Sequence, residues 1–132
     1  MKKFKKAFLD CIKARSITGL RSGKDHPKFT GIWMVVVEDR IFGRSYYLSK
    51  RSWYNTFIRE KSGEIKCGDV IVKVRGVKPR ASARPAYRTG RLEESINAAY
   101  EAKYGGKPHN RVWIDGLKHP DRVAHTMEFK VA

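Results

Sequence analysis

The sequence predicts an α+β domain or a small antiparallel β-barrel. About five or six segments have the alternation or the β-branched content of strands, and three have helical periodicity. Most of these segments are separated by short links, which favours antiparallel neighbours. The length of 132 residues is typical of one domain, so we expect a single domain over residues 1–132.

The first part of this domain, residues 1–28, is expected to be a basic helix followed by a loop. Apolar side chains recur at helical spacing within residues 3–15, and charged side chains fill most of the positions between them. The breaker-rich stretch 22–27 predicts the loop. Residues 29–132 then form the body of the domain. The expected apolar stripe of the helix is Phe4, Ala7, Phe8, Cys11 and Ile12.

The body is expected to begin with two strands and a short helix. Residues 32–37 form an apolar run rich in β-branched side chains, which predicts a strand buried on both faces. Glu38-Asp39 is a plausible turn, and the aromatic content of residues 40–48 favours a second strand. Ser52 is a candidate N-cap, because aromatic side chains repeat at i and i+4 directly after it.

A hairpin follows, in which Gly68-Asp69 joins residues 65–67 to residues 70–77. The longer arm alternates valines with residues that include Lys73 and Arg75, which indicates a one-sided strand with a basic outer face.

The last third of the chain contains the clearest helix, residues 91–104. Its apolar stripe is well spaced, Thr89 is a candidate cap, and two glycines end it. Before it, residues 78–87 contain two prolines and are expected to be irregular. After it, residues 112–114 suggest a short strand, and the alternation in residues 126–131 predicts a half-buried one.

The charge of the chain indicates an anionic partner. Lys and Arg total 29 against 13 Asp and Glu, which gives a net charge of +16. Nearly half of this excess lies in residues 1–28. A phosphorylated small molecule, a nucleic acid and an acidic membrane surface all remain open as partners. The apolar run Ile32–Val37 is too short to span a bilayer, and two cysteines, Cys11 and Cys67, favour reduced thiols in a cytoplasmic protein.

Few residue patterns indicate catalysis by the chain itself. The four histidines share no metal-ligand spacing, and neither cysteine has a nearby ligand partner, so no metal site is expected. No Gly-x-Ser-x-Gly elbow or nucleotide-binding glycine motif occurs. Catalytic residues are therefore left unassigned.

One segment indicates phosphate recognition. Ser49, Lys50, Arg51 and Ser52 place two hydroxyls and two cations between the expected strand end and the expected helix start. A phosphate there would receive helix N-terminal amides, hydroxyl donors and charge-assisted hydrogen bonds. The alternative is that Ser52 is only a cap and that Lys50 and Arg51 form a solvated turn.

A basic nucleic-acid-binding domain without catalysis is the second hypothesis. The net charge of +16, with six Tyr, six Phe and three Trp, supplies both attraction for phosphates and possible stacking surfaces. However, no known nucleic-acid-binding motif occurs, and most aromatic residues fall on apolar stripes. The helix in residues 3–15 either lies on an anionic membrane or packs against the domain.

The order of the elements and four segments resemble a small bacterial family of unknown function. This family lies within the split β-barrel superfamily of flavin and deazaflavin binders, the pyridoxamine-phosphate-oxidase-like fold. The similarity covers roughly residues 31–132. The segments that carry it are Gly31–Val36, Tyr46–Trp53, Gly63–Gly68 and, most distinctively, Asn97-Ala98-Ala99-Tyr100-Glu101-Ala102-Lys103-Tyr104-Gly105.

The resemblance implies a six-stranded split barrel with three helices, usually a homodimer, that holds FMN or a deazaflavin in a groove at the dimer interface. Superfamily members hold the phosphate just after the second or third strand, which falls on Ser49, Lys50, Arg51 and Ser52 here. A looser transfer places Trp33, Arg44 and Tyr46 near the ring system. Such proteins use the cofactor for hydride chemistry, which implies a possible small oxidoreductase.

Overall fold

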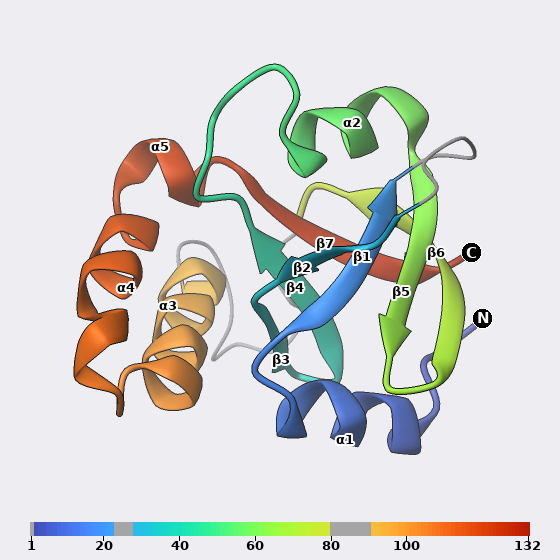
Figure 1. Ribbon diagram of the computed structural model, residues 1–132, viewed down its shortest axis with the longest axis horizontal. Helices are drawn as coiled ribbons and strands as arrows, with labels where there is room; N and C mark the ends of the chain where they lie inside the picture. Colours follow the sequence, from blue (N-terminus) through green and yellow to red (C-terminus); the bar gives the residue numbers. More distant parts are fainter. Residues whose placement is uncertain (1, 23–27, 80–90) are drawn as a thin grey trace.

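The computed structural model describes residues 2–22, 28–79 and 91–132 and has an α+β fold around a nearly closed antiparallel barrel. Seven strands are described in the order β2-β1-β5-β6-β7-β4-β3 (Figure 1). Their bounds are β1 Thr18–Ser22, β2 Thr30–Ile32, β3 Met34–Val37, β4 Arg40–Arg44, β5 Ser62–Cys67, β6 Val70–Val77 and β7 Thr126–Val131. The predicted α+β split-barrel class is confirmed, with one strand more than expected.

The barrel closes at Trp33. β2 pairs with β1 at one edge of the sheet, and β3 pairs with β4 at the other edge. Only Trp33 separates β2 from β3, so the chain itself joins the two edges. The single strand expected over residues 32–37 is therefore two strands. Joining the edges in this way leaves little unpaired strand backbone exposed to other chains.

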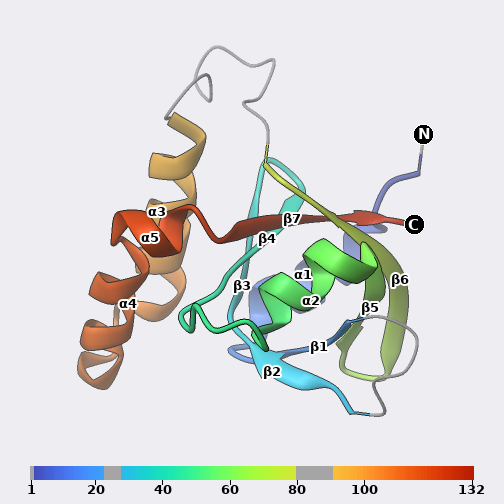
Figure 2. The same cartoon turned by 90° about the horizontal axis from the view of Figure 1, so that it is seen from above.

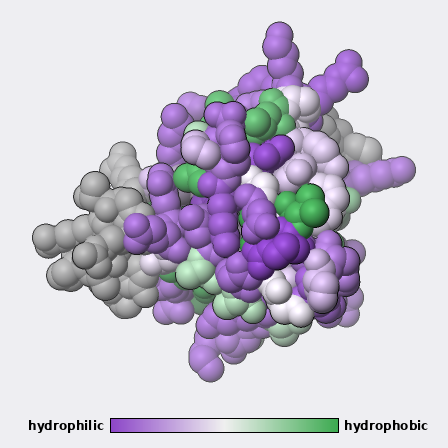
Figure 3. All heavy atoms as spheres, turned by 90° about the vertical axis from the view of Figure 1, so that its left-hand side faces the viewer, coloured by the Kyte–Doolittle hydropathy of each residue, from purple (hydrophilic) through white to green (hydrophobic). Residues whose placement is uncertain are grey.

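Five α-helices of the described residues cover the barrel, two more than expected. Their bounds are α1 Lys6–Ala14, α2 Trp53–Glu60, α3 Arg91–Tyr104, α4 Arg111–Leu117 and α5 Pro120–Val123, with a 3-10 turn at Pro108–Asn110. Helices α1 and α2 lie at opposite ends of the barrel, and α3–α5 form a layer beside it (Figures 1 and 2). The outer surface of that layer is mostly hydrophilic (Figure 3).

Two apolar clusters form the core. One fills the barrel and includes Phe57 and Ile65, with Phe8, Leu9 and Ile12 of α1 packed into it. The predicted α1 stripe is confirmed at Phe8 and Ile12, which are buried, and at Phe4 and Cys11, which are partly buried against the same cluster. It is wrong at Ala7, which is exposed, and it left out Leu9, which is buried. The helix therefore packs against the barrel. This is one of the two arrangements that the sequence left open, the other being binding to an anionic membrane.

The second cluster lies between the barrel and the helical layer. The stripe of α3 packs against β3 and β4. At the end of α3, the N–H of Gly105 donates to the Glu101 carbonyl at 2.8 Å, and a Cβ on Gly105 would lie 2.5 Å from that oxygen. The expected helix end is confirmed. Members of this cluster are Val35, Val37, Phe42, Leu92, Ile96, Tyr100, Tyr104, Ile114 and Leu117.

Side chains of α3 bind the backbone carbonyls around the barrel closure. The Tyr100 hydroxyl donates to the Trp33 carbonyl at 3.0 Å. The Lys103 ammonium donates to the carbonyls of Met34 and Ile12 at 2.6 and 2.7 Å. The Tyr104 ring stacks on the Trp33 indole at 4.1 Å between centroids. Carbonyls shielded from water require hydrogen-bond donors. At this corner α3 supplies the donors that neighbouring strands would supply elsewhere in the sheet.

Several sequence predictions for individual elements were wrong. Residues 112–114 belong to α4 rather than to a strand, because Ile114 and Leu117, three residues apart, are buried against α3. The strand expected over residues 40–48 ends at Arg44, where the pairing with β7 stops. The stretch taken for the end of a basic helix and loop contains β1, whose short segment has one large apolar residue, Leu20.

The other expectations were confirmed in part. The β5–β6 hairpin turns at Gly68, whose φ of 60° suits glycine, and Lys73 and Arg75 form the predicted basic face of β6. β7 is more buried than predicted, because Glu128 pairs with Arg40 at 2.8 Å. The Thr89 cap, the loop over 23–27 and most of the irregular segment 78–87 lie outside the described residues.

We predict that Lys103→Met lowers the free energy of unfolding by about 1–3 kcal/mol, because it removes the charged donor that the Ile12 and Met34 carbonyls share. The measurement is urea denaturation followed by circular dichroism. Lys107→Met is the matched control, because Lys107 is an exposed lysine just beyond α3. Equal stability of the two variants would show that the Lys103 contacts do not support the fold.

We also predict that the two thiols differ in reactivity. Both are free, with Cys11 half-buried and Cys67 buried. Burial raises the pKa of Cys67 to about 12, and hydrogen bonding to Cys11 adds to this effect. Since only thiolates react readily, a thiol reagent should label at most one cysteine in the native protein and two in denaturant. Rapid labelling of native Cys11→Ser protein would contradict this prediction.

Candidate functional site

A cavity of about 650 Å³ lies where the barrel closure meets α2 and the helical layer. Its walls come from β1, β2, the end of β4, the segment 45–52, the start of α2, and α4. Small-molecule sites commonly have volumes of about 300–1,000 Å³, so the cavity is large enough for a cofactor.

The cavity brings together six of the seven residues that the sequence suggested. The exception is Lys50, which is exposed and does not line it. The segment after β4 turns back over the barrel end, so residues far apart along the chain meet there. The six lining residues are Trp33, Arg44, Tyr46, Ser49, Arg51 and Ser52.

Arg44, the last residue of β4, is held firmly by the barrel and α3. Its Nε donates to Thr126 Oγ1 at 2.7 Å, and its Nη1 donates to the side-chain oxygen of Asn97 and to the Leu117 carbonyl. Its backbone N–H donates to the Tyr100 hydroxyl at 2.9 Å. The guanidinium is therefore fixed in one orientation, with only 5% of the residue exposed.

The charge of Arg44 is not compensated by the groups that hold it. Its hydrogen-bond acceptors are a hydroxyl, an amide and a carbonyl, and none is a carboxylate. Its Nη2 is buried without a hydrogen-bond partner in the described part of the chain. Burial lowers the pKa of Arg44 below its ordinary value, although Tyr100 and Glu93 oppose this effect. An anionic or acceptor-rich ligand in the cavity would offset the cost of burying this cation.

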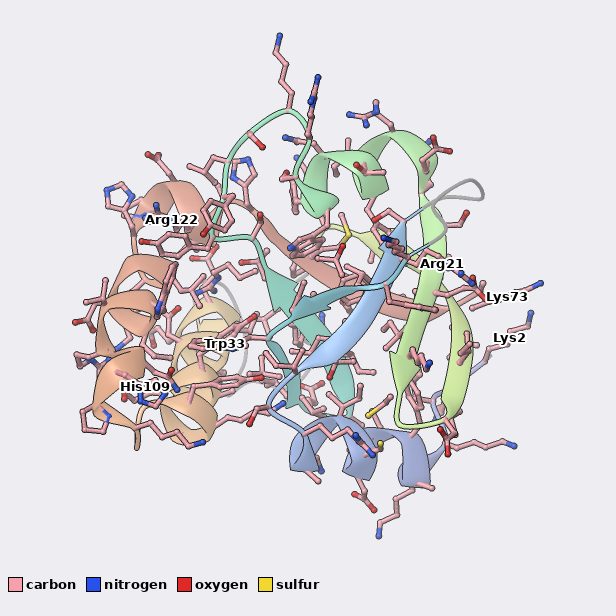
Figure 4. The ribbon with its side chains drawn as sticks, in the orientation of Figure 1. Lys2, Arg21, Trp33, Lys73, His109 and Arg122 are labelled. Atoms are coloured by element: carbon pink, nitrogen blue, oxygen red, sulfur yellow. The ribbon has the colours of Figure 1, made fainter. Side chains whose placement is uncertain are left out.

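Aromatic side chains form the walls beside Arg44. Trp33 lies between the barrel and the helical layer, against Tyr104 (Figure 4). The Tyr46 ring meets the Trp113 ring edge-on at 4.7 Å, and the guanidinium carbon of Arg122 lies 4.0 Å from the Tyr46 centroid. Arg122 also donates to the Tyr46 carbonyl at 2.7 Å. These contacts give the cavity rigid, flat apolar walls.

The segment before α2 supplies hydroxyls and a second cation. Ser52 is the N-cap of α2, as predicted, and its hydroxyl accepts from the Asn55 N–H at 3.3 Å. The Ser49 carbonyl accepts from the Ser52 N–H at 3.1 Å, which fixes the turn. Arg51 is exposed at the cavity rim. Ser52 can therefore both cap α2 and take part in the site, because it lines the cavity at the start of the helix.

The described lining is basic and contains no carboxylate. Lys28, Arg44 and Arg51 line the cavity, and no described lining residue is Asp, Glu, His or Cys. No group of three or more metal-ligating side chains occurs in the ranges 2–22, 28–79 and 91–132. The chain therefore offers positive charge, hydroxyl donors and aromatic surfaces, a combination suited to binding a planar anionic molecule.

Sequence reasoning missed Trp53, Trp113 and Asn110 as cavity residues. Trp53 was expected to follow the cap Ser52 in a short helix, and no site role was assigned to it. Trp113 and Asn110 lie in and just before α4, and the expectation of a strand there gave no reason to place them near Tyr46. A correct helix prediction for residues 111–117 would have been the necessary signal.

The comparisons with known proteins show the family and the fold. A family model described as "Uncharacterized protein conserved in bacteria (DUF2255)" matches residues 9–127. No curated protein matches significantly. A solved structure, that of conserved hypothetical protein Rv2991 from Mycobacterium tuberculosis, is similar with a TM-score of 0.53 and 11% identity, over 100% of this chain and 85% of that chain.

At this identity the structural match shows the fold alone. In the described part of the chain, no helix has the length and apolar character needed to cross a bilayer. The family match covers most of the sequence, including β1 to β6, the cavity walls and α3. The chain therefore belongs to DUF2255, a family of uncharacterized proteins conserved in bacteria.

Proposed function

We propose that the cavity binds a phosphorylated flavin or deazaflavin, with FMN as the simplest candidate, and that the protein is a small oxidoreductase. The observation that carries the proposal is Arg44, a buried and uncompensated cation on the cavity wall. The resemblance to flavin-binding split barrels supports the same ligand class. When bound, a flavin or deazaflavin would supply the hydride chemistry, and the described lining would supply position and charge.

Residues at the start of α2 would hold the phosphate. Arg51 supplies a full charge, Ser49 and Ser52 supply hydroxyls, and the first turn of α2 supplies unpaired backbone N–H groups. This is the arrangement expected for a phosphate, because each oxygen can accept a hydrogen bond from a charged or oriented donor. Lys50 does not line the cavity, so the proposed phosphate site keeps three of the four residues suggested by the sequence, Ser49, Arg51 and Ser52.

The aromatic walls would hold the ring system. Trp33, Tyr46 and Trp113 offer flat surfaces, and stacking on such surfaces suits a planar heteroaromatic ring. Arg44 would contribute its positive charge at the cavity wall, while its Nη2 is enclosed by protein atoms in this structure. Because its other donors are already bound, Arg44 would orient the ligand without needing to change its own conformation.

The proposal includes a cytoplasmic homodimer, as in split barrels whose cofactor lies between subunits. Large apolar side chains are exposed around the cavity and on α4, with Tyr47 67% and Trp113 41% exposed. A second copy covering the cavity rim would bury them. Sedimentation velocity should give twice the mass of 15.2 kDa, and a monomer at micromolar concentration would contradict the dimer.

We predict that Arg51→Ala weakens FMN binding about tenfold and leaves riboflavin binding unchanged. A charge-assisted hydrogen bond contributes about 1.5 kcal/mol or more, and 1.4 kcal/mol corresponds to a factor of ten in affinity. Titration followed by flavin fluorescence measures both dissociation constants, and a phosphorylated deazaflavin is titrated in parallel.

Lys50→Ala is the matched control, because it removes one neighbouring cation that does not line the cavity. It should change FMN affinity by less than twofold. Equal losses for FMN and riboflavin in Arg51→Ala would contradict the assigned phosphate position. Absence of any fluorescence change with FMN and deazaflavin at millimolar concentration would overturn the proposed function itself.

A further inference from the structure

The excess positive charge belongs to the barrel and not to the helical layer. The described residues of the barrel with α1 and α2, which are 2–22, 28–79 and 126–132, contain 19 Lys and Arg against seven Asp and Glu. Residues 91–125, which form the helical layer, contain six against five. Of the net charge of +16, the described barrel with α1 and α2 therefore carries +12 and the helical layer carries +1.

Part of this charge lies on the outer face of β5, β6 and β7. Lys66, Lys73, Arg75 and Lys130 are exposed there, and none has a carboxylate partner in the part of the chain that the structure describes. Glu64, directly opposite Lys73, is bound instead by Arg21, whose Nε lies 3.0 Å from Glu64 Oε1. We call these four residues the basic face.

The basic face contains a pair of like charges in direct register. Arg75 of β6 lies opposite Lys130 of β7, and the residue on the other side of Arg75 is Ser62. Like charges directly opposite each other destabilise an antiparallel pair. The chain thus carries an electrostatic cost at a surface position where many uncharged residues would fit. An anionic partner would remove that cost.

The positive surface continues beyond the strands. Arg75 and Lys130 also line a groove of about 850 Å³ between β7 and α1, together with Lys2, Lys3, Lys6 and Lys13. Four carboxylates also line this groove: Asp10 is paired with Lys6, Glu128 is paired with Arg40, and Glu38 and Asp39 form the turn between β3 and β4. Lysines and arginines still outnumber carboxylates there by seven to four. Lys2 and Lys73 project from the same side of the molecule, away from Trp33 and Arg122 near the cavity (Figure 4). The basic face and the groove therefore form one extended band.

We propose that this band binds the phosphate backbone of nucleic acid, independently of the cavity. An extended row of cations, most of them without a carboxylate partner among the described residues, suits a polyanion with many phosphates better than it suits one small anion. The large exposed aromatic side chains of the described residues, Tyr47 and Trp113, lie at the cavity and not on the band. The band therefore contacts the sugar-phosphate backbone of the nucleic acid, with little preference for base sequence or for single strands over duplex.

The test uses fluorescence anisotropy with labelled 20-nucleotide single-stranded and duplex DNA between 50 and 200 mM salt. The triple variant Lys73→Gln, Arg75→Gln, Lys130→Gln should bind at least 100-fold more weakly at 50 mM salt. Its slope of log affinity against log salt should be shallower by about 2.7, since each phosphate contact contributes about 0.9.

The matched control is Lys50→Gln, Lys61→Gln, Lys107→Gln, which removes the same charge from exposed positions that do not line the groove. It should retain affinity within about threefold. A second readout separates binding from folding: Arg75→Gln alone should raise the melting temperature slightly, because it relieves the repulsion with Lys130, while weakening DNA binding.

Three results would overturn the proposal. The first is no binding of wild-type protein at 50 mM salt. The second is an equal loss in the control variant, which would show an effect of net charge alone. The third is tighter binding to vesicles containing anionic lipid than to DNA, which would assign the band to a membrane surface. FMN titration of the triple variant should match wild type, so failure here is distinguishable from failure of the cavity proposal.

Discussion

The closure of the barrel depends on hydrogen bonds from α3 to the backbone around Trp33. One residue carries the chain from the edge strand β2 to the opposite edge strand β3, so the carbonyls at this corner lie where the strand ladders end. Tyr100 and Lys103 donate to the carbonyls of Trp33 and Met34, and Tyr104 stacks on the Trp33 ring. Without these donors, buried carbonyls would be unpaired at the point that joins the two ends of the sheet.

The same helix connects the fold to the cavity. The Tyr100 hydroxyl accepts from the backbone N–H of Arg44, and Asn97 binds the Arg44 guanidinium. Glu101 lies farther along α3, and hydrogen bonds from Arg111 and Lys118 lower the pKa of its carboxyl group to about 2. The charged carboxylate therefore ties α3 to α4, which forms one wall of the cavity. One stretch of helix therefore closes the barrel, orients its buried cation and places the helical layer.

Much of this could be predicted from sequence where the pattern is local. The periodicity of residues 91–104 gave the bounds of α3, and the position of Ser52 gave the cap of α2. The segment from Asn97 to Gly105 was the most distinctive part of the family resemblance, but its role could not be read from the pattern, because its partners are Trp33, Met34 and Arg44, more than 50 residues away.

β1 was missed because Thr18–Ser22 has one large apolar residue, and its burial comes from pairing with β2 and β5. Arg44 was predicted as a site residue only through the family resemblance. The physical reason to place it in the site is its burial with an unpaired Nη2, which only the structure shows.

The most direct test of the central claim is amide hydrogen exchange, measured by NMR, in Tyr100→Phe. This change removes the hydroxyl shared by the Trp33 carbonyl and the Arg44 N–H and keeps the buried ring. The account predicts that the Arg44 amide exchanges about tenfold faster or more, relative to the amide of Ile65 in the distant strand β5, because one buried hydrogen bond is lost locally. An unchanged ratio of the Arg44 and Ile65 exchange rates would contradict the claim that α3 holds the barrel closure and its cation together.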